Sequence, residues 1–226
     1  MRLTGSMVER PLVLSEREGV PELLEPWAND LLEAVDLRPG ERVLDTGLHW
    51  RHGEASRLPF ADGSFDVAVC LQGLQLVPDR DRALLEVRRV LASRGRVGVT
   101  VWGRIGQSPV FAALADSLEL RAGVQVAAAV RWLFSLSEPE DLRAVLAASG
   151  FGRIRVRSAR RATRFPSVAE FLRRYVPGAP VGSATAHWSE HEWREVVADL
   201  ESELRPWVDA SGFRVVTEAN TGVARR

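Results

Sequence analysis

The strongest constraint on the fold lies between residues 65 and 102, where two apolar segments flank one amphipathic helix. FDVAVCLQGL (65–74) is apolar enough to be covered on both faces, as strands of a parallel sheet are, and RVGVTVW (96–102) is a second strand. Between them, apolar residues recur at helical spacing: Ala83, Leu84, Val87, Val90 and Leu91. Asp79 is a good N-cap for this helix, and Gly95 lies where a C-terminal cap is expected. This strand–helix–strand unit predicts an α/β fold around a parallel sheet.

Further helices and a short strand are expected on either side of this unit. The apolar spacing of PELLEPWANDLLEAV (21–35) predicts a helix that the turn residues RPGE (38–41) end. RVLD (42–45) then predicts a short buried strand. Residues 108–149 are rich in Ala and Leu and are predicted to be mostly helical, with a break at SLSEPED, where Ser137 can cap the next helix.

The remaining segments predict one more helical region between two strands. GRIRVRSARRATRF (152–165) alternates apolar and basic residues, as an exposed or edge strand does. SVAEFLRRYV (167–176) predicts a short helix, GAPVGSATA (178–186) a loop of small residues, and 187–207 a further helix. FRVVTEANTGVARR (213–226) is expected to close the chain as a strand or hairpin.

Composition excludes several classes of protein. The 226 residues suit one α/β domain with a helical subdomain, and the net charge of zero argues against nucleic-acid binding through a large basic field. The single cysteine, Cys70, rules out an internal disulfide and fits a reducing cytoplasm. No apolar run approaches the ~20 residues that span a bilayer, and MRLTGSMVER at the N-terminus lacks an apolar signal core. We therefore expect a cytoplasmic protein without membrane or nucleic-acid partners.

Three stretches of the chain resemble class I S-adenosylmethionine-dependent methyltransferases, most closely those of the ubiquinone/menaquinone-biosynthesis type (methyltransferase type 11). They are GERVLDTG (40–47), the run from Gly53 to Trp102, and FSLSEPEDLRAVLAASGF (134–151). The most specific part joins an acidic residue and alanine to LPF-x-DGSFD, a helix ending in RRVL, and an apolar strand. The resemblance implies a Rossmann-like sheet with helices on both faces, a helical lid, and methyl transfer from S-adenosylmethionine to a small-molecule substrate.

On this resemblance the whole chain, 1–226, is one methyltransferase-like domain. Its cofactor-binding core is expected over 20–105, a helical lid with an edge strand over 106–210, and a C-terminal strand over 211–226.

The resemblance also implies a set of cofactor-binding residues. In such enzymes the first strand ends in an acidic residue, followed by a loop of the form D-x-G-x-G-x-G, and Asp45 and Gly47 match its first two fixed places. Glu54 and Ala55 would border the adenine, with the Glu54 carboxylate accepting a hydrogen bond from the adenine amine. Three residues at the end of the next strand would line the methionine and substrate side: Cys70, Leu71 and Gln72.

Spacing indicates that part of the family's fold is missing after the first strand. Asp45 and Glu54 lie nine positions apart, whereas a parallel crossover needs a dozen or more residues and a full βαβ unit takes about 30. A helix, a strand and a second helix are therefore absent, and so is the carboxylate that grips both ribose hydroxyls. We expect a truncated sheet with a weakened cofactor site. A homodimer that covers the exposed surface of the first strand is a further expectation.

Each candidate residue also has a structural interpretation. Asp45 can cap local backbone, Gly47 can serve a plain turn, and Glu54 can be solvated. Cys70 can be a small buried apolar side chain, and Gln72 can satisfy backbone groups at a strand end. No catalytic residue is assigned, although Tyr175, Gln72 or a histidine can supply a base if the acceptor needs one.

Two hypotheses of function from different classes therefore remain, and a metal site is not expected. One is methyl transfer to a small molecule; the other is a catalytically inactive relative that acts as a binding module, with a non-functional deletion relic as a third alternative. His187 and His191 are spaced as a metal pair on one helix face, and His49 and His52 flank Trp50 and Arg51 within the truncated junction. No third ligand is evident.

Overall fold

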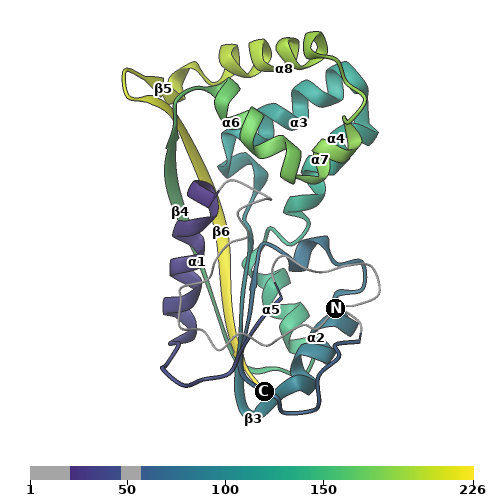
Figure 1. Cartoon of the computed structure of the whole chain (residues 1–226), viewed down its shortest axis with the longest axis vertical. Coiled ribbons are helices and arrows are strands. Elements are labelled where there is room, and N and C mark those ends of the chain that lie inside the picture. The colour runs from purple at the N-terminus through teal and green to yellow at the C-terminus, as the bar shows by residue number, and fades with distance from the viewer. Residues whose placement is uncertain (1–20, 47–56) are drawn as a thin grey trace.

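The computed structural model describes residues 21–46 and 57–226 and contains a mixed sheet with helices on both faces (Figure 1). The strand order is β1-β2-β3-β6-β4. β1, β2 and β3 are parallel, and β6 runs antiparallel to both β3 and β4. The strands are β1 (Val43–Asp45), β2 (Phe65–Leu71), β3 (Leu91–Trp102), β4 (Gly152–Phe165), the short β5 (Val208–Asp209), which pairs with β6, and β6 (Gly212–Arg225). The predicted α/β fold is confirmed.

One face of the sheet is covered by α1 (Pro21–Val35). Its buried residues follow the predicted helical stripe, with Leu23, Trp27, Leu31 and Val35 packed into the core on this face. The helix lies close to the strands because β3 carries Gly98 beneath it. A side chain at this position would meet α1 directly.

The opposite face is covered by α2 (Arg80–Val90) and α5 (Pro139–Ala148). A second core cluster on this face joins the two helices to β2 and β3, including Ala68, Cys70, Leu84, Val87, Val97, Val99, Leu142 and Leu146. Coverage on both faces explains the nearly continuous apolar sequence of β2. Asp79 caps α2 as predicted, since its Oδ1 accepts a hydrogen bond from the backbone N–H of Arg82 at 3.0 Å.

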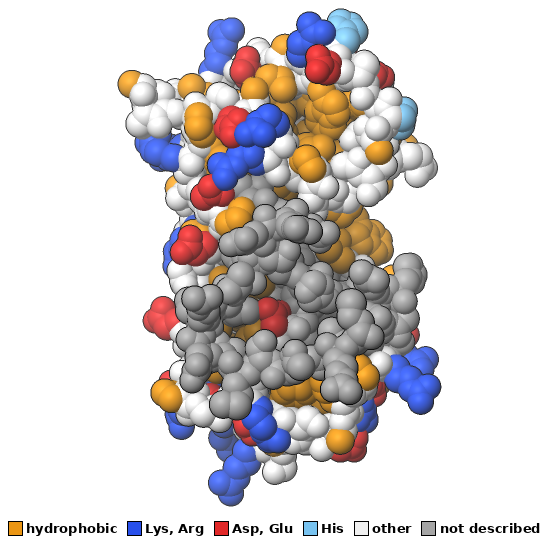
Figure 2. All heavy atoms as spheres, in the orientation of Figure 1, with side chains coloured by type: hydrophobic (Ala, Val, Ile, Leu, Met, Phe, Trp, Pro, Cys, Tyr) orange, Lys and Arg blue, Asp and Glu red, His pale blue; other side chains and the backbone are white. Residues whose placement is uncertain are grey.

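The other helices gather into a lobe at one end of the molecule, and β4 and β6 extend into it (Figure 1). They are α3 (Pro109–Ala122), α4 (Val124–Arg131), α6 (Val168–Tyr175), α7 (Pro180–Ala184) and α8 (Glu190–Glu203). The aromatic ring of Phe111 joins the lobe to the sheet, because it lies 5.9 Å from Trp102 and 6.1 Å from Phe171. Apolar side chains are visible on this lobe (Figure 2). Leu120 on α3, Val124 on α4 and Trp132 after α4 are exposed.

Short 3-10 turns connect these elements. They are η1 (Leu74–Leu76), η2 (Ile105–Gln107), η3 (Trp132–Phe134), η4 (Val176–Gly178) and η5 (Arg205–Trp207). Within the described ranges, no helix combines the length and apolar character required to cross a bilayer.

Several local predictions were wrong. Gly95 does not cap α2, because the helix ends at Val90 and Leu91 is already extended. Ser137 does not cap α5; its carbonyl instead accepts a hydrogen bond from Asn220 Nδ2 at 2.7 Å. The small-residue loop predicted over 178–186 contains the helix α7, and the helix predicted over 187–207 is α8 followed by η5.

β1 is held to β2 by an ion pair at the amino ends of the two strands. Arg42 contacts Asp66 through Nη2 and Oδ1 at 2.9 Å, and its Nε and backbone N–H donate to Oδ2 at 3.0 and 2.9 Å. These hydrogen bonds lower the pKa of Asp66 to about 2. β1 is an end strand of the sheet in the described part of the chain, so this contact compensates for its short length.

Candidate functional site

The parallel strands place the carboxyl ends of β1, β2 and β3 at one edge of the sheet, next to the helical lobe (Figure 1). Asp45 ends β1 opposite Val69, and β2 continues to Leu71, which lies opposite Thr100 of β3. Asp45 is exposed at this edge. The chain leaves β1 in a fixed direction, because the backbone N–H and hydroxyl of Thr46 both donate to the Val69 carbonyl, at 2.9 and 3.0 Å.

Gln72 follows β2 in a left-handed backbone conformation, with φ of 52°. Such a conformation is uncommon for residues other than glycine and is found where surrounding contacts hold it, often at functional sites. Here the Gln72 N–H donates to the Thr100 carbonyl at 2.8 Å, which fixes the residue against the end of β3. The turn directs the chain into η1.

A buried polar cluster lies directly behind this turn. Gln75 is fully buried, and its Nε2 donates to Gln72 Oε1 at 2.8 Å. Gln72 Nε2, Gln75 Oε1 and Arg80 Nε are buried atoms with no hydrogen-bond partner in the described part of the chain. Leaving such an atom unpaired costs about 1–3 kcal/mol, so the cluster is suited to a polar ligand that completes its hydrogen bonds.

Arg80 connects this cluster to the helical lobe. Its Nη2 donates to the Gln75 carbonyl at 3.1 Å and to Ser135 Oγ at 2.5 Å. The guanidinium also lies over the Trp132 ring, 5.6 Å from the ring centroid, and partial burial lowers the pKa of Arg80. The lobe and the edge of the sheet are therefore held together at the candidate site.

The structure separates the residues predicted to bind a cofactor. Asp45, Leu71 and Gln72 lie at the carboxyl edge, whereas Cys70 is buried in the core between the sheet and the helices α2 and α5. Leu71 points to the opposite face, because successive residues of a strand alternate. Gly47, Glu54 and Ala55 lie outside the described residues, as does the whole junction where a deletion was predicted.

Among the candidates for a general base, Gln72 lies at the carboxyl edge, and His49 and His52 lie outside the described residues. Tyr175 stacks on Phe171 at 5.4 Å and contacts Phe111 at 5.1 Å, and burial raises the pKa of its hydroxyl. His191 lies on α8, with its Nε2 3.7 Å from Glu195. Among residues 21–46 and 57–226, no group of three or more His, Cys, Asp or Glu side chains is arranged to hold a metal ion.

Sequence reasoning missed Gln75 and Arg80. The only local signal for Gln75 is a glutamine set between leucines three positions after Gln72, a spacing that the apolar pattern does not require. The role of Arg80 depends on Ser135, which lies far away in the sequence.

Part of the chain is similar in sequence to known methyltransferases. Residues 24–99 match the family described as "Methyltransferase domain". A demethylmenaquinone methyltransferase of Lactobacillus johnsonii is 36% identical over 69 residues, which cover 30% of this chain and 28% of that protein. The ubiquinone/menaquinone biosynthesis C-methyltransferase UbiE of Ralstonia pickettii is 36% identical over 86 residues, covering 37% and 35%. The matches therefore span about a third of these relatives.

Solved structures share the fold at low sequence identity. A candidate methyltransferase of Bacillus halodurans superposes with a TM-score of 0.51 at 14% identity, covering 87% of this chain and 97% of that protein. A candidate methyltransferase from an antibiotic biosynthesis pathway of Anabaena variabilis gives a TM-score of 0.53 at 12% identity, covering 85% and 94%. These similarities establish the Rossmann-like methyltransferase fold.

Proposed function

Since the chain is related to class I S-adenosylmethionine-dependent methyltransferases in sequence and fold, we propose that it transfers a methyl group from S-adenosylmethionine to a small molecule. The observation that carries the proposal is the pair Gln72 and Gln75 at the carboxyl edge of the sheet, each with one buried amide atom that has no hydrogen-bond partner among the described residues. Ligands of open α/β sheets bind at this edge.

The residues at the edge suit the methionine end of the cofactor. S-adenosylmethionine, when bound, supplies a methyl group already activated on a sulfonium. The Asp45 carboxylate would accept hydrogen bonds from the ammonium group, Leu71 would border the methionine chain, and Gln72 Nε2 would donate to a carboxylate or hydroxyl oxygen. Gly47, Glu54 and Ala55 complete the proposed set on the adenine side.

The protein's main contribution to methyl transfer would be alignment of the two reactants and exclusion of water. The helical lobe adjoins the edge and is tied to it by Arg80, so it is the proposed lid. The sequence match to the family ends at residue 99, before this lobe begins. The quinone-type acceptors in the relatives' names therefore indicate a small-molecule class, and we propose no particular acceptor. We also propose a cytoplasmic protein without nucleic-acid or membrane partners.

Titration calorimetry with S-adenosylmethionine and S-adenosylhomocysteine tests the proposal, on protein shown by circular dichroism to be folded. We expect binding of both, weaker than in relatives with a complete glycine loop. Replacing Gln75 with methionine removes a buried oxygen that has no partner among the described residues, but it also removes the donor to Gln72 Oε1, so the free energy of unfolding should change by less than about 1 kcal/mol. The same change should weaken ligand binding at least about tenfold, if the lost hydrogen bond contributes ~1.4 kcal/mol.

Gln125→Met is the matched control, because Gln125 is exposed on α4. It should change neither stability nor affinity. No heat from either ligand with the wild type would overturn the methyltransferase proposal. If Gln75→Met leaves ligand binding unchanged, the glutamine pair is not part of the binding site.

The alternative function is a catalytically inactive binding module. The nine-position spacing between Asp45 and Glu54 favours it, since the segments that normally flank β1 are missing from the sequence. In this alternative a second copy of the chain would cover β1. We expect a homodimer at high concentration by sedimentation equilibrium. A monomer at every concentration tested would contradict this part of the proposal.

A further inference from the structure

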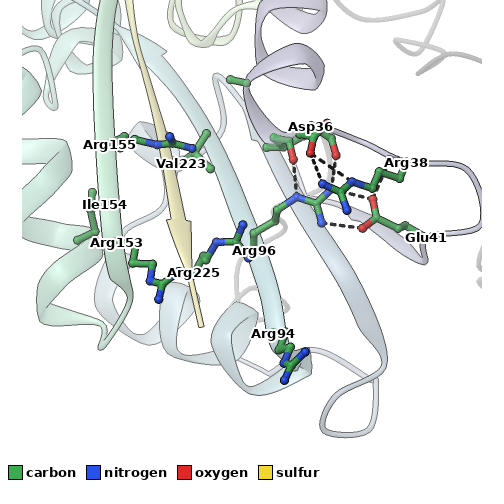
Figure 3. Close-up of a pocket in the computed structure, with 12 residues that line it drawn as sticks. Asp36, Arg38, Glu41, Arg94, Arg96, Arg153, Ile154, Arg155, Val223 and Arg225 are labelled. Atoms are coloured by element: carbon green, nitrogen blue, oxygen red, sulfur yellow. Dashed lines mark hydrogen bonds and ion pairs between the residues drawn. The ribbon is translucent and has the colours of Figure 1, made fainter.

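An open pocket of about 610 Å³ lies at the other end of the sheet, between the end of α1 and the strands β3, β4 and β6 (Figure 3). Its charged lining is strongly unbalanced, because six arginines face two acidic residues, Asp36 and Glu41. The arginines are Arg38, Arg94, Arg96, Arg153, Arg155 and Arg225. In a chain of zero net charge, this pocket is a local concentration of positive charge.

Both carboxylates are already engaged by two of these arginines. Arg96 forms a two-pronged contact with Glu41, in which Nη1 and Nη2 each donate to one carboxylate oxygen at 2.7 Å. Arg38 pairs with Asp36 at 2.6 Å. These hydrogen bonds hold the pKa of Asp36 and of Glu41 below their usual values, so both carboxylates are ionised and paired at neutral pH.

The other four arginines form no ion pair with a described carboxylate, although Arg225 is close enough to Asp36 to help lower the pKa of that carboxyl. Arg94, Arg153, Arg155 and Arg225 are exposed, and none has an acidic side chain within 4.0 Å among the residues that the structure describes. In Figure 3, Asp36 and Glu41 lie with Arg38 and Arg96 at one end of the pocket, and Arg153 and Arg155 lie at the other. The uncompensated charge is therefore concentrated on the β4 and β6 side.

The register of the sheet creates this concentration. Arg96 of β3 lies directly opposite Arg225 of β6, and Arg155 of β4 lies opposite Val223, two residues before Arg225. Like charges on opposing positions of neighbouring strands destabilise a sheet. Glu41 already pairs with Arg96, so a bound anion would chiefly offset the charge of Arg225 and its neighbours on β4.

Two residues that line the pocket also have strained backbones. Asp36 has a φ of 53° and Arg153 a φ of 50°, the left-handed region that residues other than glycine seldom adopt. Arg153 follows Gly152, which lies opposite Arg225 in the sheet, and both arginines line the pocket (Figure 3). Strain of this kind persists where the surrounding structure holds it, and it is frequent at ligand sites.

We propose that this pocket binds a small anion that carries two or more linked phosphate groups. Guanidinium groups match phosphate oxygens in a two-pronged geometry, and several of them here have no competing carboxylate. The volume falls within the roughly 300–1,000 Å³ typical of small-molecule sites and exceeds the needs of a single phosphate. The concave shape favours a compact ligand over an extended nucleic-acid strand. This site is separate from the carboxyl edge and does not depend on the proposed methyl transfer.

Inorganic pyrophosphate is the probe, titrated into the full chain by calorimetry at low and at high salt, with orthophosphate for comparison. We expect pyrophosphate to bind more tightly than orthophosphate, with affinity that falls as salt rises. The double variant Arg155→Gln, Arg225→Gln should lose at least about tenfold in pyrophosphate affinity, because each charged hydrogen bond contributes enough for such a loss. The variant Arg194→Gln, Arg205→Gln is the matched control, since it removes the same charge from α8 and η5.

Arg153→Asn gives an independent measurement that keeps the fold, because asparagine tolerates the left-handed backbone better than arginine. It should also weaken pyrophosphate binding while leaving the far-ultraviolet dichroism spectrum unchanged. No heat from pyrophosphate at low salt would overturn the proposal. An equal loss of pyrophosphate affinity in the Arg194, Arg205 control would also overturn it. So would a single-stranded oligonucleotide that binds more tightly than pyrophosphate and whose binding the Arg155, Arg225 variant abolishes.

Discussion

Replacing Trp27 with alanine is expected to lower the free energy of unfolding by about 3–5 kcal/mol, the range for large aromatic side chains removed from a core. Trp27 is 1% exposed and lies midway along α1. Its ring contacts the edge of Trp102 at a centroid distance of 6.3 Å, and its Nε1 donates to the buried Thr217 hydroxyl at 3.1 Å. Alanine would leave a cavity and an unpaired hydroxyl, since α1 is the helix that covers this face.

Urea denaturation followed by circular dichroism measures this loss. Trp27→Phe separates the two causes, because it keeps most of the ring volume and removes the hydrogen bond to Thr217. Trp132→Ala is the control: Trp132 is 53% exposed, so its removal should cost less than about 1 kcal/mol. A Trp27→Ala variant as stable as the wild type would mean that α1 does not pack on the sheet in solution.

Adding a single methyl group at Gly98 is expected to be nearly as damaging, with a loss of about 2–3 kcal/mol for Gly98→Ala. A Cβ atom there would lie 2.2 Å from Val35 Cγ1 and 2.8 Å from Leu31 Cδ1. Val35 and Leu31 are each about 1% exposed, so neither can move aside without displacing α1 from β3.

Urea denaturation also tests this clash, through a second substitution that should relieve it. Gly98→Ala combined with Val35→Ala should recover part of the lost stability relative to the sum of the single variants, because the nearest obstructing group is removed. Gly106→Ala is the control, since a Cβ at that glycine meets no atom within 4 Å. Additive losses in the double variant would show that helix and strand are farther apart than the structure places them.

Regular elements could be predicted because their signals are local. The apolar run that predicted β2 and the alternation that predicted β4 reflect which faces of a strand are covered, and both strands were confirmed, although β2 ends at Leu71 and not at 74 as predicted. Helix ends were less predictable. Ser137 is a good capping residue by type, but its carbonyl accepts a hydrogen bond from Asn220 of β6. No local sequence pattern reveals this distant partner. The helix α7 forms from small residues because Val181 is buried in the lobe.

The candidate site was also predictable only in part. Asp45, Leu71 and Gln72 lie together at the carboxyl edge because strand order and direction follow from the fold, and their role in cofactor binding stays a prediction. Gln75 Oε1 and Arg80 Nε, which have no partner in the described part of the chain, lie where η1 meets η3 and have no sequence signature. The arginine pocket is assembled from three strands whose register alone makes Arg96 and Arg225 neighbours. Gly47, Glu54 and Ala55 stay predictions.

The position of β6 has a consequence for how the chain reaches this structure. β6 is later in the sequence than every other described strand, yet it lies between β3 and β4 and supplies the partner for both. Its contact with β3 includes a hydrogen bond between Thr100 and Thr221, which are 121 positions apart in the sequence. A ribosome must therefore synthesise residues 212–225 before the middle of the sheet can close. Until then β3 and β4 keep unpaired edges, so folding should be slow and most vulnerable to aggregation in the nascent chain.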